Sequence, residues 1–117
     1  MERYQEVLHN LVINDRRLLA RLNGPDPADP ECALDDKSAA LVRIASLVAT
    51  DGPVETFRWT VGDALAAGAT ENEVVGVLLS VAGLVGVARV ASTVRKVALA
   101  MDYDIDASLE KYEPHGA

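Results

Sequence analysis

Cysteine, histidine and aromatic residues are scarce in this chain of 117 residues, which has one Cys, two His, one Trp, one Phe and three Tyr. Because Cys32 stands alone, it cannot form an internal disulfide, complete a CxxC redox motif or build a cysteine-rich metal site. It lies beside Glu31 in a proline-rich stretch, and a neighbouring carboxylate disfavours the thiolate form that a reactive cysteine needs. We therefore expect Cys32 to be an incidental thiol and thiol peroxidase activity to be absent.

Metal-binding and cofactor motifs are missing as well. His9 and His115 are far apart in the sequence, and no grouped acidic residues accompany either of them, so neither predicts a zinc site. No serine has the Gly-x-Ser-x-Gly context of a hydrolase, and neither a GxGxxG nor a P-loop pattern occurs. The sequence thus predicts no metal and no cofactor. His9 remains only a minor candidate for a lone general base.

Basic residues are outnumbered: 11 Lys and Arg stand against 18 Asp and Glu, for a formal net charge of -7. The only local basic cluster consists of Arg16, Arg17 and Arg21, which is too short for the basic surface that binds a phosphate backbone. The longest apolar stretch, residues 74–88, falls short of the ~20 residues that a membrane-spanning helix needs, and the polar start does not resemble a signal peptide. We therefore expect a cytoplasmic protein without nucleic-acid or membrane partners.

Apolar residues make up half of the chain, and they recur at helical spacing without strand-like alternation. This pattern predicts an all-α fold. Helices are expected at 3–22, with a break at Asn14–Asp15, and at 35–50, 53–67, 71–82 and 87–101. The expected organisation is an N-terminal helical segment at 1–23, a linker at 24–33, a helical domain at 34–103 and a C-terminal tail at 104–117.

Several helix ends carry capping signals. The pair Asp35–Asp36 can cap the helix that follows the linker, and Gly68 is placed to end the helix at 53–67. Thr70 and Glu73 fit a capping box, in which each side chain accepts a hydrogen bond from the other residue's backbone N–H. Asp106 is expected to cap a last turn in the tail. These signals fix the expected helix boundaries.

The stretch 74–88 has apolar residues on every side of the expected helix and carries no charge. A helix without a polar face must be covered all round, and a chain this short has few elements to cover it. Gly83 and Gly86 allow a break within the stretch. Three small residues would let a neighbouring backbone approach closely: Gly76, Ser80 and Ala82. The pattern therefore predicts a homo-oligomer.

Two runs of sequence suggest a known family. Residues 34–41 read LDDKSAAL, and residues 58–74 read RWTVGDALAAGATENEV. Both resemble the carboxymuconolactone decarboxylase-like family, in which an Ala-Leu-x-Ala-Gly-Ala-Thr pattern ends one helix and an acidic, capped helix follows. The similarity covers roughly residues 34–103. It implies a compact helical domain with a central helical hairpin, assembled as a trimer or as a hexamer made of trimers.

The positions that carry chemistry in this family are occupied by other residues here. Its alkylhydroperoxidase branch implies a CxxC motif and a histidine where this chain has Pro53, Thr56 and Thr60. The glutamate that the same branch places on the preceding helix would fall near Ala40. The decarboxylase branch also keeps the histidine that is replaced by Thr60. The resemblance therefore implies a fold and an assembly, while the family's known chemistry does not transfer.

A different set of residues is left to bind or act on a small molecule. Glu55, Trp59 and Asp63 are spaced four apart on one helical stripe, so an indole with flanking acids could line a pocket. Thr60 can hold a substrate by hydrogen bonding but cannot titrate near neutral pH. Arg43, amid apolar residues, could bind a carboxylate in bidentate fashion. The alternatives are solvated acids, a core or interface tryptophan, and a structural ion pair for the arginine.

Two functions are compatible with these observations. The first is a carboxymuconolactone decarboxylase-like enzyme, a lyase acting on a small carboxylated or lactone-type substrate. Glu55 or Asp63 would supply acid–base chemistry, while Arg43, Trp59 and Thr60 would bind the substrate. The second is a catalytically silent family member that serves as a ligand-binding or oligomeric interaction protein, and the missing histidine and cysteines favour it.

Overall fold

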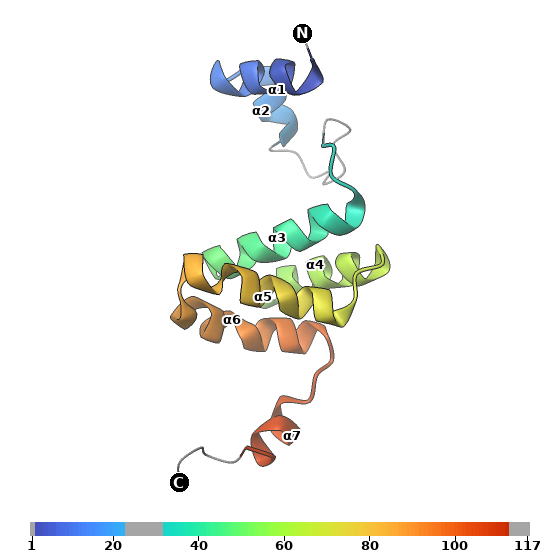
Figure 1. The fold of residues 1–117 in the computed structure, drawn as a ribbon, viewed down its shortest axis with the longest axis vertical. Helices are drawn as coiled ribbons and strands as arrows, with labels where there is room; N and C mark the ends of the chain where they lie inside the picture. Colours follow the sequence, from blue (N-terminus) through green and yellow to red (C-terminus); the bar gives the residue numbers. More distant parts are fainter. Residues whose placement is uncertain (1, 23–31, 113–117) are drawn as a thin grey trace. The chain divides into compact units, whose positions relative to one another are not determined.

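The computed structural model describes residues 2–22 and 32–112, which form seven α-helices and no strand (Figure 1). The predicted all-α fold is confirmed for this part of the chain. The helices are α1 (Arg3–Val12), α2 (Arg16–Leu22), α3 (Asp36–Thr50), α4 (Val54–Ala66), α5 (Glu71–Val85), α6 (Val87–Ala100) and α7 (Ile105–Glu110). Most of the expected linker at 24–33 and the end of the tail, with His115, lie outside the described residues.

The chain divides into two compact units, Met1–Leu34 and Asp35–Ala117. In the first unit, α1 and α2 are separated at the break predicted for Asn14–Asp15. Asn14 adopts a left-handed conformation with φ of 55°, which ends the first helix. The Asp15 carboxylate then accepts hydrogen bonds from the backbone N–H groups of Arg17 and Leu18, and so caps the second helix.

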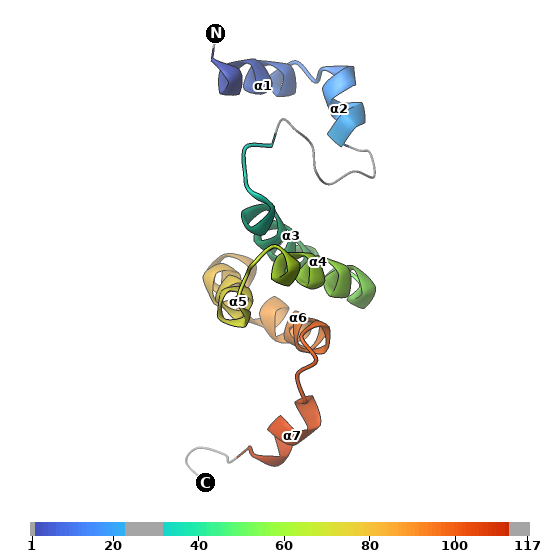
Figure 2. The ribbon, with the colours of Figure 1, turned by 90° about the vertical axis from the view of Figure 1, so that its right-hand side faces the viewer.

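The second unit is a bundle of α3, α4, α5 and α6, which run alternately in opposite directions (Figure 1). Viewed nearly end-on, α3 and α6 lie between α4 and α5, so that α4 and α5 occupy opposite sides of the bundle (Figure 2). Phe57 is fully buried at the centre of the core. The other large side chains that are fully buried in the bundle are Ile44, Val48, Val61, Val74, Val97 and Thr93.

The predicted caps of α3 and α5 are confirmed. The side chain of Asp35 accepts a hydrogen bond from the backbone N–H of Ser38. Thr70 and Glu73 form the expected capping box, with N···O distances of 3.0 and 3.1 Å. Gly68 has a φ of 99°, a conformation that strongly favours glycine, and it ends α4 as predicted.

Two details of the predicted boundaries are wrong. The helix expected to end near Ala82 continues to Val85, because Gly83 stays helical and only Gly86, with a φ of 96°, turns the chain into α6. The carboxylate that caps α7 is that of Asp104, which accepts a hydrogen bond from the backbone N–H of Ala107; Asp106 lies in the first turn instead. Both aspartates satisfy the sequence preference for a cap, and only the backbone path selects between them.

Lys96 of α6 ties its helix to the turn between α3 and α4. Its ammonium group donates to the Asp51 carboxylate at 3.0 Å and to the Gly52 carbonyl at 2.8 Å, and it lies 5.9 Å from the centre of the Phe57 ring. An added Cβ at Gly52 would lie 2.6 Å from Cδ2 of Leu47, so a larger residue there would require the Leu47 side chain to shift. The turn is therefore held mainly by the ammonium group of Lys96.

Replacing Lys96 with Met should lower the free energy of unfolding by about 1–2 kcal/mol, because a charge-assisted hydrogen bond to a partly buried carbonyl and the ion pair with Asp51 are both lost. Urea denaturation monitored by circular dichroism measures this change. The matched control is Arg95→Met on the exposed side of the same helix, which should change stability by less than about 0.5 kcal/mol. Equal effects of the two substitutions would contradict a role for Lys96 in holding the turn.

Candidate functional site

The predicted site residues of α4 lie on an exposed helix face. Glu55 and Asp63 are exposed, and Trp59 between them keeps 67% of its surface accessible. Glu55 forms an exposed ion pair with Arg58, at 3.7 Å between Oε1 and Nη1. The structure thus brings the three predicted stripe residues onto one side of α4. It places them on an open surface, where they do not line any of the hollows described below.

The remaining predicted site residues are dispersed. Thr60 is half-buried on α4, next to Trp59 in sequence. Arg43 is exposed on α3, so its guanidinium group is not enclosed in the apolar surroundings that its sequence neighbours suggested. Its neighbour Ile44 turns inward and is fully buried, which accounts for the apolar pattern around the arginine.

A polar cluster joins the starts of α3 and α5. The Lys37 ammonium group lies 3.1 Å from the Glu73 carboxylate, and Glu73 is also part of the capping box with Thr70. The backbone N–H of Thr70, followed by Lys37, lowers the pKa of Glu73, and the backbone N–H of Ser38 lowers the pKa of Asp35. Both carboxylates are therefore held as anions by structural partners. A shallow hollow of about 370 Å³ adjoins the cluster, lined by Asp35, Asp36, Lys37, Ala67 and Gly68.

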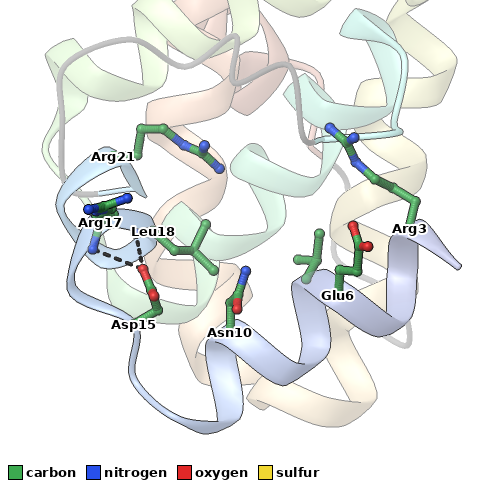
Figure 3. A pocket seen from close by; sticks show the side chains of 8 residues that line it. Arg3, Glu6, Asn10, Asp15, Arg17, Leu18 and Arg21 are labelled. Carbon is green, nitrogen blue, oxygen red and sulfur yellow. Dashed lines mark hydrogen bonds between the residues drawn. The ribbon is translucent and has the colours of Figure 1, made fainter. Parts of the chain in front are cut away.

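The first unit contains a hollow of about 290 Å³ between α1 and α2, which the sequence analysis did not identify (Figure 3). The side chains of Arg3 and Arg21 extend toward each other across it, while Glu6 and Asn10 face it from α1. Its lining is completed by Val7, Asp15, Arg17 and Leu18. The lining therefore combines guanidinium and carboxylate groups.

The sequence carried a signal for this hollow. On α1 the lining residues are three and four positions apart, and on α2 Arg17 and Arg21 are four apart, so each set shares one helix face. The basic cluster at 16–21 is too short for a surface that binds nucleic acid, but its Arg17 and Arg21 line this hollow. Its pairing with a mixed face of α1 depends on the turn at Asn14–Asp15, which periodicity alone does not specify.

A small apolar hollow of about 190 Å³ lies between α6 and α7. It is lined by Val94, Arg95, Ala98, Tyr103, Ile105, Ser108 and Leu109. Among the described residues there is no group of three or more His, Cys, Asp or Glu side chains that could hold a metal ion. In the same part of the chain, no helix is both long and apolar enough to cross a lipid bilayer.

The outer side of α5 carries exposed apolar side chains. We call it the α5 surface and define it by four exposed apolar side chains and three small residues between them. The apolar side chains are Val75, Leu79 and Leu84 of α5 and Val87, the first residue of α6, and Leu79 and Leu84 are 74% and 89% exposed. The small residues are Gly76, Ser80 and Gly83. On the inner side of the same helix, Val74 and Leu78 are buried in the core. The predicted all-round apolar character of this helix is therefore visible on both of its sides.

Comparison of the chain with protein families, with curated proteins and with solved structures finds no match. The similarity to the carboxymuconolactone decarboxylase-like family thus stays a prediction from residues 34–41 and 58–74.

The carboxylates at the starts of α3 and α5 predict how stability responds to pH. Because the folded-state pKa values of Asp35 and Glu73 lie below their ordinary values, the stability that these groups contribute is present above about pH 4.5 and is lost as the pH falls further. Melting temperatures recorded between pH 3 and pH 7 measure the loss. Glu73→Gln keeps a capping oxygen but not the charge, so its acid-induced drop should be smaller than that of the wild type.

The matched control for the pH experiment is Glu110→Gln on the exposed side of α7, which should follow the wild-type curve. If the melting temperatures of Glu73→Gln depend on pH in the same way as those of the wild type and of Glu110→Gln, the Glu73 carboxylate does not stabilise the fold through its charge.

Proposed function

We propose that this chain is the subunit of a homo-oligomeric interaction protein of the carboxymuconolactone decarboxylase-like type, in which the α5 surface of one copy is covered by another copy. The observation that carries the proposal is the exposure of Leu79, Leu84 and Val87 on a stretch without a single charge from 74 to 88. Burying apolar surface stabilises an association by roughly 25 cal/mol per Å² before the entropic cost of assembly is counted. Exposed apolar patches of this kind mark protein interaction sites.

The second part of the proposal concerns the face that remains open. Trp59 is exposed on α4, and α4 lies on the opposite side of the bundle from α5 (Figure 2). Tryptophan is enriched at the energetic centres of protein interfaces, and Glu55 and Asp63 beside it supply a polar rim. We therefore assign the α4 face to the binding of a partner or small ligand by the assembled protein, without chemical turnover. The cytoplasmic location expected from the sequence belongs to the same proposal.

Substitution of Leu79 with Glu tests the assembly. A charge placed in the centre of an apolar contact should weaken self-association by about 100-fold or more, since burying an unpaired carboxylate costs at least about 3 kcal/mol. Sedimentation equilibrium over a micromolar concentration range measures this. Val42→Glu on α3 is the matched control, because Val42 is a half-exposed apolar residue outside the α5 surface, and it should leave the association constant unchanged.

A wild-type chain that sediments as a lone protomer at micromolar concentration would refute the assembly. Self-association that Leu79→Glu and Val42→Glu weaken equally would refute the role of the α5 surface.

An enzyme is the second candidate, and one observation favours it: Glu55, Trp59 and Asp63 do share one face of α4. In this case a small carboxylated or lactone-type substrate would lie on the indole, a carboxylate would move the proton, and Arg43 would hold the substrate's own carboxylate. Such a site needs further enclosure, which a second copy could supply.

The enzyme candidate predicts that Arg43→Ala and Glu55→Ala each abolish turnover in a screen of small carboxylated and lactone substrates. Loss of a charged substrate contact or of the acid–base group commonly lowers the rate by a factor of about 10²–10⁴. Absence of turnover in the wild type, together with a rise in melting temperature on addition of one screened compound, would favour the non-catalytic binding protein instead.

A further inference from the structure

The α5 surface contains two glycines that the protomer's own fold does not explain. Gly76 and Gly83 lie inside the helix, where glycine is a poor helix former, and neither has a positive φ. A Cβ built on either residue would meet nothing within 4 Å. The same is true of Gly62 on α4, so an open Cβ position does not by itself mark a contact. Gly76 and Gly83 differ from Gly62 in lying on the apolar outer side of α5, where close approach by another backbone gives a physical reason for glycine.

The positions of these residues are symmetric along the helix. Gly76 and Gly83 are seven residues apart, about two helical turns, so they lie on nearly the same line along α5. Leu79 and Ser80 lie midway, one on each side of that line. Gly83 is nine residues from the buried Val74, which puts it on the opposite side of the helix, facing outward. Reversal about the point between residues 79 and 80 therefore exchanges the two glycines with each other, and it exchanges the apolar residues Val75 and Leu84 in the same way.

We infer that two copies of this chain pair through α5 in antiparallel fashion, about a two-fold axis that passes between Leu79 and Ser80. This arrangement places Gly76 of each copy opposite Gly83 of the other, so that the two backbones approach closely at both crossings. Leu79 meets the same residue of the second copy on one side of the axis, and Ser80 does so on the other. A two-fold contact of this kind uses the same patch on both copies and closes on itself.

Charge complementarity selects a second copy in this orientation. The uncharged stretch begins after Glu71 and Glu73 and ends at Arg89. Within the described part of the chain, Glu71 and Arg89 are both exposed and make no ion pair. An antiparallel pair brings the acidic start of one α5 to the α5–α6 turn of the other copy, and Arg89 lies in the first turn of α6 directly after it. The same arrangement sets opposite helix-dipole ends side by side. A parallel pair would bring two acidic starts together.

The inference rests on the proposed function and adds the orientation of the partner. Its first test uses substitutions that cannot harm the protomer. Gly76→Ala and Gly83→Ala fit without contact in the single chain and improve helix propensity, so neither should lower the melting temperature of the protomer. Each added methyl should hold the two backbones apart, and the double variant should associate about tenfold or more weakly by sedimentation. Gly62→Ala, also without contact within 4 Å but on α4, is the matched control and should associate like the wild type.

The second test determines orientation by cross-linking in a Cys32→Ser background. Residues 75 and 84 both lie on α5 and are equally far from the axis, so a chain with Val75→Cys and a chain with Leu84→Cys should cross-link to each other with a short bis-maleimide. Cross-linking of either variant to itself should be much weaker, since two copies of residue 75 are separated by about 14 Å along the helix in the antiparallel pair. Efficient cross-linking of each variant to itself would show a parallel pair and overturn the inference.

The remaining outcomes are also decisive. Unchanged association of Gly76→Ala,Gly83→Ala would overturn the close pairing of α5, and so would an oligomer that no combination of the two cysteine variants cross-links. In either case the assembly itself survives, because another surface must then hold the copies together. A wild-type chain that remains a protomer would instead refute the proposed function together with the inference.

Discussion

The fold of the second unit depends on the burial of one side of α5. The bundle has too few helices to bury the opposite side of α5 as well. Val74 and Leu78 belong to the same buried core as Phe57. Without these two side chains, the core would lose its apolar contacts on the side that α5 covers. The same helix carries Leu79 and Leu84 outward. A sequence that served a lone protomer would place charged residues at those positions, as α4 does with Glu55 and Asp63 on its own exposed side.

Local signals in the sequence were sufficient for most of the fold. The Asp35 cap, the Thr70–Glu73 capping box and the glycine at 68 each involve residues at most four positions apart, so they act before any tertiary contact is made. Errors arose where two local signals competed. Gly83 and Gly86 have the same intrinsic freedom, and the core contacts of Val81 and Val85 keep α5 helical through the first glycine.

The candidate site could be predicted only as a pattern along one helix. Spacing correctly put Glu55, Trp59 and Asp63 on one face of α4, but it could not say whether that face is enclosed, because enclosure depends on how α4 packs with α3 and α6. Arg43 illustrates the same limit. Its apolar neighbours in sequence point into the core, while the arginine itself points outward. The hollow between α1 and α2 depends on a turn, so no single-helix pattern could reveal it.

The arrangement of the bundle links assembly to function. Because α4 and α5 lie on opposite sides of the bundle (Figure 2), a pair formed through α5 would leave the α4 face of each copy uncovered, and this face carries the exposed Trp59. A two-fold contact also constrains the number of subunits. A simple trimer has no two-fold axis, whereas a hexamer built from two trimers has three. Of the two assemblies that the family resemblance implies, only the hexamer is compatible with an α5 pair. In a simple trimer, α5 of one protomer would instead have to be covered by a different face of the next protomer, so the contact would join two unlike surfaces.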